Sequence, residues 1–173
     1  MGERIVPVPV RGAWSRHVRA GEAGLASGRG GRGGRFHRPG QPAVYLADSD
    51  ATAWAEWYRW LAEQAYPPEQ GLPRDLHRMA VDLDTVIDLS SAAARRTAGV
   101  PERMRPAHSQ WAAFQDKADE FRAAGAQGVL YSSAARTRSL CLCVFEAGLA
   151  GLRIEGEPVR VLAPPAPPRG LRT

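Results

Sequence analysis

Residues 42–66, PAVYLADSDATAWAEWYRWLAEQAY, place a short apolar segment directly before a long amphipathic one. The run after Pro42 is short and apolar, which predicts a buried strand. Ser49 or Asp50 can cap a helix that begins there, and Pro67 marks its end. The stretch is therefore predicted to be a buried strand followed directly by a capped helix.

The helix predicted from Asp50 has an apolar side that we expect to face the core. The residues at helical spacing on this side are Trp54, Trp57, Tyr58, Leu61 and Ala65. Burial of the tryptophans, at about 2–3 kcal/mol each, would anchor the helix. Trp60 lies one turn beyond Glu56 on the same side, where it can line a pocket or contact a partner.

The other segments alternate irregularly between strand and helix patterns. An edge strand or an extended arm is predicted over 4–18, because Pro7 and Pro9 interrupt its apolar residues. Further strands are predicted over 78–90, 128–133, 140–147 and 157–164, and further helices over 90–100 and 108–125, closed by Gly99 and Gly125. Strands and helices that do not alternate regularly indicate the α+β class.

The length of 173 residues fits one domain, predicted over 1–162. The proline-rich segment 163–173 is predicted to be a C-terminal tail that passes from an ordered edge into disorder. No apolar run approaches the roughly 18 residues of a membrane span, and the first residues lack the pattern of a signal peptide. We therefore expect a cytoplasmic protein with no membrane partner.

Positive charge is concentrated at the start of the chain. Residues 1–38 contain eight arginines and two glutamates, whereas the remainder is close to neutral. This favours an anionic ligand. One interpretation is a nucleic-acid-binding module formed by the Arg/Gly-rich segment 11–38. However, the run GRGGRGGR is short and passes at once into Phe36 and a strand, which favours a loop that binds one defined anion.

The cysteines and histidines do not indicate a metal site. Cys141 and Cys143 alternate in SLCLCVFEA, which is typical of small apolar residues in a buried strand. Two cysteines this close on one strand are poorly placed for a disulfide. The four histidines are scattered without the spacing of metal ligands. We expect no metal.

Four residues lie in an order and spacing that point to a specific site. Arg35 lies in a Gly-Arg-aromatic step, Tyr45 follows inside the predicted strand, and Glu56 lies in the predicted helix. Downstream, GAQGVLYSSAAR places Ser133 at the end of another predicted strand. Over roughly 12–147 this arrangement resembles the RES-domain family, which is named for its arginine, glutamate and serine.

The resemblance implies an ADP-ribosyltransferase-like fold, a mixed, split β-sheet with flanking helices. It also implies roles in a site for NAD+. Glu56 would hold the ribose and stabilise an oxocarbenium-like transition state, as carboxylates do in glycosidases. Arg35 would bind the phosphates, and Tyr45 would stack on the nicotinamide ring. Ser133 would donate a hydrogen bond to a phosphate or to the ribose.

Three further positions follow from the same resemblance. Arg16, on the first predicted strand, is a second candidate phosphate contact. His37 stands where the family often has Asn or Asp. Ser132 stands where the family often has Pro, which makes it a rival of Ser133 for the serine role.

The family consists of NAD-degrading toxins of bacterial toxin–antitoxin pairs. The resemblance implies cleavage of the nicotinamide–ribose bond by hydrolysis or phosphorolysis, with NAD+ as substrate and no separate cofactor. It implies a Xre-type helix-turn-helix antitoxin as partner, DNA binding only through that antitoxin, and a homodimer or higher assembly as a possible state. A second interpretation keeps the same site but transfers ADP-ribose to a protein target.

Overall fold

The computed structural model describes residues 5–25, 33–104 and 108–172. Residues 26–32, which include most of the run GRGGRGGR, lie outside the described residues. The elements in chain order are β1 (Val8–Arg19), β2 (Ala43–Ala47), α1 (Asp50–Glu63), η1 (Pro68–Gly71), β3 (Arg74–Leu89), α2 (Ala92–Ala98), η2 (His108–Gln110), α3 (Trp111–Ala123), β4 (Gly128–Ser132), β5 (Leu140–Phe145), η3 (Glu146–Gly151) and β6 (Leu152–Val161).

The six strands form one sheet that is split into two halves. Their order is β1-β2-β5-β4-β3-β6, and β1 also pairs with β3. The first part of β3 runs antiparallel to β1 and β6, whereas its last residues run parallel to β4, from Val86 opposite Gly128 to Leu89 opposite Tyr131. The halves meet again where Ser15 of β1 pairs with Ala47 of β2. The predicted α+β class with a mixed, split sheet is confirmed.

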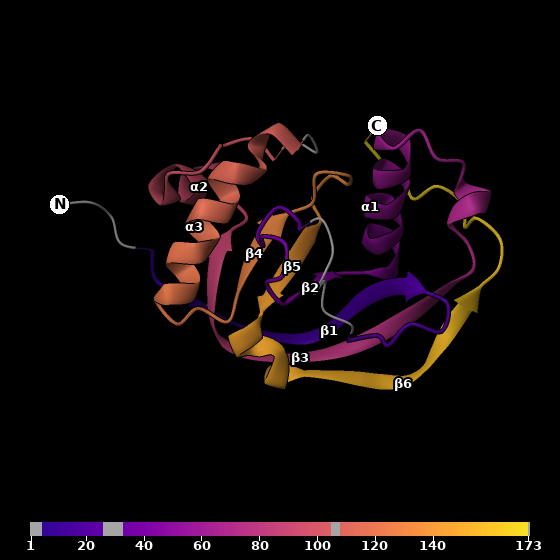
Figure 1. The fold of residues 1–173 in the computed structure, drawn as a ribbon, viewed down its shortest axis with the longest axis horizontal. Helices are drawn as coiled ribbons and strands as arrows, with labels where there is room; N and C mark the ends of the chain where they lie inside the picture. The colour runs from indigo at the N-terminus through magenta and orange to yellow at the C-terminus, as the bar shows by residue number, and fades with distance from the viewer. Residues whose placement is uncertain (1–4, 26–32, 105–107, 173) are drawn as a thin grey trace.

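The helices flank the half of the sheet formed by β2, β5 and β4. In the view of Figure 1, α2 and α3 stand to the left of these strands and α1 stands to the right. Phe114 of α3 and Phe36, which lies before β2, are buried in one apolar cluster with residues of β4 and β5. A second cluster joins the two halves of the sheet, and a third lies under α1. None of the described helices is long and apolar enough to cross a membrane.

The first strand is part of the sheet and is not an extended arm. β1 pairs with β3 from Arg19 opposite Arg74 to Val8 opposite Val86. The register shifts between Val8 and Val10, at Pro9, where a residue without a backbone N–H is tolerated.

Helix α1 begins where its capping signal predicts. Ser49 is extended, and its side chain accepts a hydrogen bond from the backbone N–H of Thr52 at 3.3 Å. Trp54, Trp57 and Leu61 are buried together, as the helical spacing predicts. This burial fixes which side of the helix faces the sheet and therefore which side Glu56 occupies. The prediction for Ala65 is wrong, because α1 ends at Glu63 and Ala65 is exposed.

Two other local predictions are also confirmed, whereas the last strand begins earlier than predicted. Helix α2 ends at Gly99, which has the left-handed backbone (φ 71°) that glycine adopts without strain. Cys141 and Cys143 are buried in β5 as free cysteines. β6 begins at Leu152, earlier than predicted, and Gly156 lies within it.

The segment after β6 differs from the predicted disordered end. It returns to α1, where the Tyr58 hydroxyl donates a hydrogen bond to the carbonyl of Pro165. It then pairs with the residues after β4 through a bridge between Arg136 and Leu171. Figure 1 shows this yellow segment passing from β6 to the end of α1. The predicted domain boundary near 162 stays a prediction.

Candidate active site

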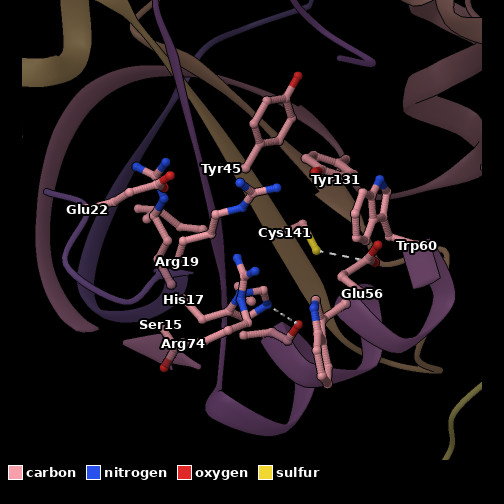
Figure 2. Close-up of a pocket in the computed structure, with 15 residues that line it drawn as sticks. Ser15, His17, Arg19, Glu22, Tyr45, Glu56, Trp60, Arg74, Tyr131 and Cys141 are labelled. Atoms are coloured by element: carbon pink, nitrogen blue, oxygen red, sulfur yellow. Dashed lines mark hydrogen bonds between the residues drawn. The ribbon is translucent and has the colours of Figure 1, made fainter. Parts of the chain in front are cut away.

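A cavity of about 470 Å³ opens between α1 and the strands. Two neighbouring hollows adjoin it, one sharing Tyr45, Glu56 and Trp60, the other sharing Arg19, Trp60 and Arg74. Figure 2 shows Glu56, Trp60 and Tyr131 toward one end of the cavity and Arg19 and Glu22 toward the other. The residues that line it are Ser15, Arg16, His17, Arg19, Glu22, Tyr45, Leu46, Ala47, Ala53, Glu56, Trp57, Trp60, Arg74, Tyr131 and Cys141.

Glu56 enters this cavity from α1 with one carboxylate oxygen held by three donors. The Ser133 hydroxyl donates to Oε1 at 2.5 Å, the backbone N–H of Ala135 at 3.4 Å, and the Cys141 thiol at 3.6 Å. Figure 2 marks the contact with Cys141. Among the residues that the structure describes, none donates a hydrogen bond to Oε2. The carboxylate is therefore oriented through one oxygen while the other stays available.

Ser133 is buried beside this carboxylate and uses its whole hydrogen-bonding capacity. Its oxygen accepts from the backbone N–H of Ala135 at 3.1 Å and of Arg136 at 2.9 Å, and its proton goes to Glu56. A hydroxyl has one proton to donate and two lone pairs. In this structure Ser133 positions Glu56, and the predicted contact of Ser133 with substrate stays a prediction.

Ser132 lies on the opposite side of the chain from Ser133. Its hydroxyl accepts a hydrogen bond from Nη1 of Arg95 at 3.4 Å, near α2. Neighbouring residues of a strand point to opposite faces, so only one of the two serines can meet Glu56. The structure places Ser133, and not Ser132, in that position.

Tyr45 lines the cavity with its ring while the preceding loop holds its hydroxyl. The backbone N–H of Phe36 donates to this hydroxyl at 3.1 Å, and Nδ1 of His37 lies 2.9 Å from it. Burial raises the pKa of Tyr45 well above its ordinary value, and nearby Cys143 adds to the rise. Burial also lowers the pKa of His37. Tyr45 is thus a neutral phenol, held at its backbone by β2 and at its hydroxyl by Phe36 and His37.

Gly34 is required where this loop approaches Tyr45. A Cβ at this position would lie 2.7 Å from the Tyr45 hydroxyl and 2.7 Å from the His37 ring. No side chain fits there unless the hydrogen-bonded pair moves. The glycine of the predicted Gly-Arg-aromatic step therefore allows the loop to seat Tyr45.

The two predicted arginines lie in different hollows. Arg16 lines the main cavity, where its Nη1 donates to the carbonyl of Gly24 at 2.9 Å. Burial lowers the pKa of Arg16 to about 10, so it stays protonated at neutral pH. Arg35 lines the adjoining hollow, with its guanidinium 5.3 Å from the centre of the Phe114 ring. The structure thus brings Glu56, Tyr45 and Arg16 to one cavity and Arg35 to its neighbour. Ser133 does not line the cavity and reaches it only through its hydrogen bond to Glu56.

Several lining residues were not anticipated from the sequence. Residues 15, 17 and 19 of β1 share one face because strand residues alternate, a signal that the sequence offers. His17 stacks on Trp54 with ring centres 4.7 Å apart. Arg74, Tyr131 and Cys141 come from other strands, and only the long-range pairing of the sheet brings them here.

No metal centre is found in the part of the chain that the structure describes. Within it, no group of three or more His, Cys, Asp or Glu side chains is close enough to hold an ion. The cavity is instead lined by two carboxylates, Glu22 and Glu56, together with two tyrosine rings and three guanidinium groups. This composition suits an anionic ligand that carries a flat ring.

Two of three comparisons with known proteins gave a match. The family model of the RES domain matches residues 9–163. A search of curated proteins gave no match. A chain in the crystal structure of the M. tuberculosis MbcT–MbcA toxin–antitoxin complex superposes with a TM-score of 0.75 at 25% sequence identity, covering 90% of this chain and 86% of that chain. With a family match over most of its length and this shared fold, the chain belongs to the RES domain family.

Proposed function

We propose that this protein is a toxin that consumes NAD+ by cleaving its nicotinamide–ribose bond. The observation that supports this best is Glu56, whose Oε1 is held by three donors while Oε2 remains available in the cavity. A fixed carboxylate beside a ribose can accept a hydroxyl proton and stabilise positive charge on the sugar. The likeness to a structure of a toxin–antitoxin complex supports the toxin role.

The proposed reaction needs no group besides substrate and acceptor. The bond between ribose C1′ and the nicotinamide nitrogen breaks, and its electron pair leaves with nicotinamide. The oxygen of water or an ionised oxygen of phosphate then bonds to C1′. Water loses a proton to solvent, whereas the phosphate oxygen carries none. Hydrolysis gives nicotinamide, ADP-ribose and a proton, whereas phosphorolysis gives nicotinamide and ADP-ribose phosphate. Glu56 lowers the barrier by stabilising the charged sugar between these steps.

The remaining cavity residues have proposed binding roles. Tyr45 would stack on the nicotinamide ring, because its hydroxyl is tied to Phe36 and His37 and its ring faces the cavity. Arg16 would bind the diphosphate, together with Arg35 from the adjoining hollow. NAD+ is substrate in this proposal, and the site requires no separate cofactor.

The described arginines of 11–38 favour this function over a nucleic-acid-binding module. Arg11 pairs with Asp82 and Asp84, and Arg38 pairs with Asp116 and Asp119, in each case on the protein's own surface. Arg16, Arg19 and Arg35 line hollows. These guanidinium groups therefore do not form one open basic face for a phosphate backbone.

The proposed partner is an antitoxin that neutralises the toxin. We propose a Xre-type helix-turn-helix protein, with DNA bound only through it and with a cytoplasmic site of action. Trp60 is a candidate contact, because half of its surface is exposed at the mouth of the cavity. Whether toxin and antitoxin form a homodimeric or larger assembly is a question for light scattering on the purified complex.

The test is NAD+ concentration over time with purified protein, with and without inorganic phosphate. Glu56→Gln should slow NAD+ loss by at least about a hundredfold, in the range of other fixed electrostatic groups. Glu120→Gln is the matched control, since Glu120 is exposed on α3 and pairs with Lys117. Equal rates for parent and Glu56→Gln would refute the assignment. Label from NAD+ that becomes bound to lysate proteins would instead support transfer of ADP-ribose.

A further inference from the structure

The segment 164–172, which we name the strap, lies beyond the residues that the RES domain model matches. After β6 it turns back across α1, with Pro165 accepting a hydrogen bond from Tyr58. It ends beside the residues that follow β4 (Figure 1). The strap lines none of the hollows described above.

The strap is joined to residues 133–137, which we name the carboxylate loop. The backbone N–H of Arg172 donates to the carbonyl of Ala135 at 2.7 Å, and the backbone N–H of Thr137 donates to Gly170 at 3.4 Å. Two side chains add to this: Nε of Arg136 donates to the carbonyl of Arg169 at 3.1 Å, and Nε of Arg172 donates to Oγ1 of Thr137 at 2.9 Å. The loop thus has a strand-like partner along one side.

The same loop supplies two of the three donors to Glu56. Ser133 and Ala135 hold Oε1 from the loop's first half. Ala135 contacts both Glu56 and the strap. Its N–H donates to Glu56, and its carbonyl accepts from the N–H of Arg172. A shift of the strap would therefore move the residue that touches the carboxylate.

Arg59 ties the helix to both segments. Its Nη1 donates to the carbonyl of Ala134 in the loop at 2.7 Å and to the carbonyl of Arg172 in the strap at 3.2 Å. Arg59 lies one turn after Glu56 on α1, so helix, loop and strap meet at one guanidinium. Helix α1, the carboxylate loop and the strap are therefore joined by hydrogen bonds close to Glu56.

We propose that the strap is a positioning element for Glu56. It holds the carboxylate loop so that Ser133 and Ala135 keep Oε1 in place. Its effect on catalysis rests on the proposed NAD+ cleavage, whereas its effect on the loop does not. Because the strap lies outside the cavity, its loss should lower kcat for NAD+ and leave KM little changed.

Two kinds of variant separate the strap's backbone contacts from its side chains. A chain that ends at Ala163 lacks the whole strap. Arg172→Pro removes the N–H that donates to Ala135, whereas Arg172→Ala keeps that N–H and removes only the side chain. Arg169→Ala is the control, because the strap contact of Arg169 uses its backbone carbonyl and its side chain is exposed.

Hydrogen–deuterium exchange of the loop and steady-state kinetics are then measured on each folded variant. We expect amide exchange in 133–137 to rise about tenfold or more, and kcat to fall about tenfold, in the truncated chain and in Arg172→Pro. Arg169→Ala should match the parent in both. Unchanged exchange in Arg172→Pro and in the truncated chain would overturn the proposal.

Two further outcomes separate this proposal from the proposed function. Faster exchange in 133–137 with kcat unchanged would overturn the proposal that the strap positions Glu56. The loop would then have become mobile without any effect on the catalytic role of Glu56. A parent protein that does not consume NAD+ would refute the proposed function, and the strap's hold on the loop would then be decided by exchange alone. Circular dichroism confirms that each variant is folded before either comparison.

Discussion

Arg74 donates a hydrogen bond from Nε to Nδ1 of His17 at 2.7 Å, between neighbouring strands β1 and β3. This contact fixes the histidine tautomer, because Nδ1 must then accept and Nε2 must carry the proton. Nε2 lies 3.1 Å from the carbonyl of Ala53 in α1 and donates to it (Figure 2). Burial, aided by the charge of Arg74, lowers the pKa of His17 to about 3. A neutral histidine thus joins the sheet to the helix that carries Glu56.

Acid should destabilise the protein through His17. Its pKa is about 3 when folded and 6.5 ordinarily, so the unfolded chain binds the proton more tightly between these values. The free energy of unfolding should therefore fall as pH drops from 6.5 toward 3, by up to about 1.4 kcal/mol per pH unit. Urea unfolding at a series of pH values measures this slope.

Two substitutions isolate the contribution of His17. His17→Phe keeps a ring against Trp54 but cannot be protonated, so its stability should change less between pH 6.5 and 4. His108→Gln replaces an exposed histidine and should keep the slope of the parent. Identical slopes for the parent and His17→Phe would contradict a neutral, buried His17.

Ser133→Ala should slow NAD+ cleavage through its effect on Glu56. Loss of the hydroxyl removes the shortest donor to Oε1, and we expect kcat to fall about 10- to 100-fold. It also leaves the N–H of Arg136 without its acceptor and the N–H of Ala135 with Glu56 alone, which costs about 1 kcal/mol of stability. Steady-state kinetics and thermal unfolding measure the two effects separately.

Ser132→Ala is the neighbouring control for this experiment. Its hydroxyl meets Arg95 and not Glu56, so its kcat should stay within about twofold of the parent. A large loss of kcat in Ser132→Ala with normal activity in Ser133→Ala would reverse the assignment of the two serines.

Arg16→Gln should weaken substrate binding. A guanidinium that meets a phosphate in a half-buried cavity contributes a charge-assisted hydrogen bond, so we expect KM for NAD+ to rise about tenfold or more. Arg11→Gln is the control. Arg11 lies five residues earlier on β1 and pairs with exposed Asp82, so its substitution should leave KM unchanged. If both variants bind NAD+ as the parent does, Arg16 is not a phosphate contact.

The cysteines should resist alkylation in the folded protein. Burial raises the pKa of Cys141 well above its ordinary value, with Glu56 adding to the rise, and raises the pKa of Cys143 to about 12. Little thiolate is therefore present at neutral pH, and iodoacetamide should modify both thiols only after unfolding. Mass spectrometry of samples treated with and without urea tests this. Rapid modification of folded protein at Cys141 would contradict its burial.

Local signals in the sequence were sufficient for the elements but not for their pairing. Ser49 caps α1 and Gly99 ends α2 as predicted, because capping depends on residues within one turn. The pairing of β1 with β3 was not predicted, because it joins residues 55 to 78 positions apart and leaves no local pattern.

The same distinction holds for the candidate site. Glu56, Tyr45 and Arg16 line the cavity, and the roles that the family resemblance implies for them stay predictions. Arg74 and Cys141 were missed, since an arginine at a strand start and a cysteine in an apolar strand look ordinary until the sheet brings them together. The strap was expected to pass from an ordered edge into disorder, because a proline-rich composition does not reveal that its backbone groups will find hydrogen-bond partners.

Because the chain is synthesised from its N-terminus, the groups that surround Glu56 are completed late in synthesis. Glu56 and the donors to its Oε1 are 77 to 85 positions apart in sequence. A ribosome therefore releases helix α1 long before it has made Ser133, Ala135 or Cys141, and a nascent chain presents Glu56 without the groups that orient it. Under the proposed function, synthesis and activity are thereby separated in time, and the site is assembled only once β5 has emerged.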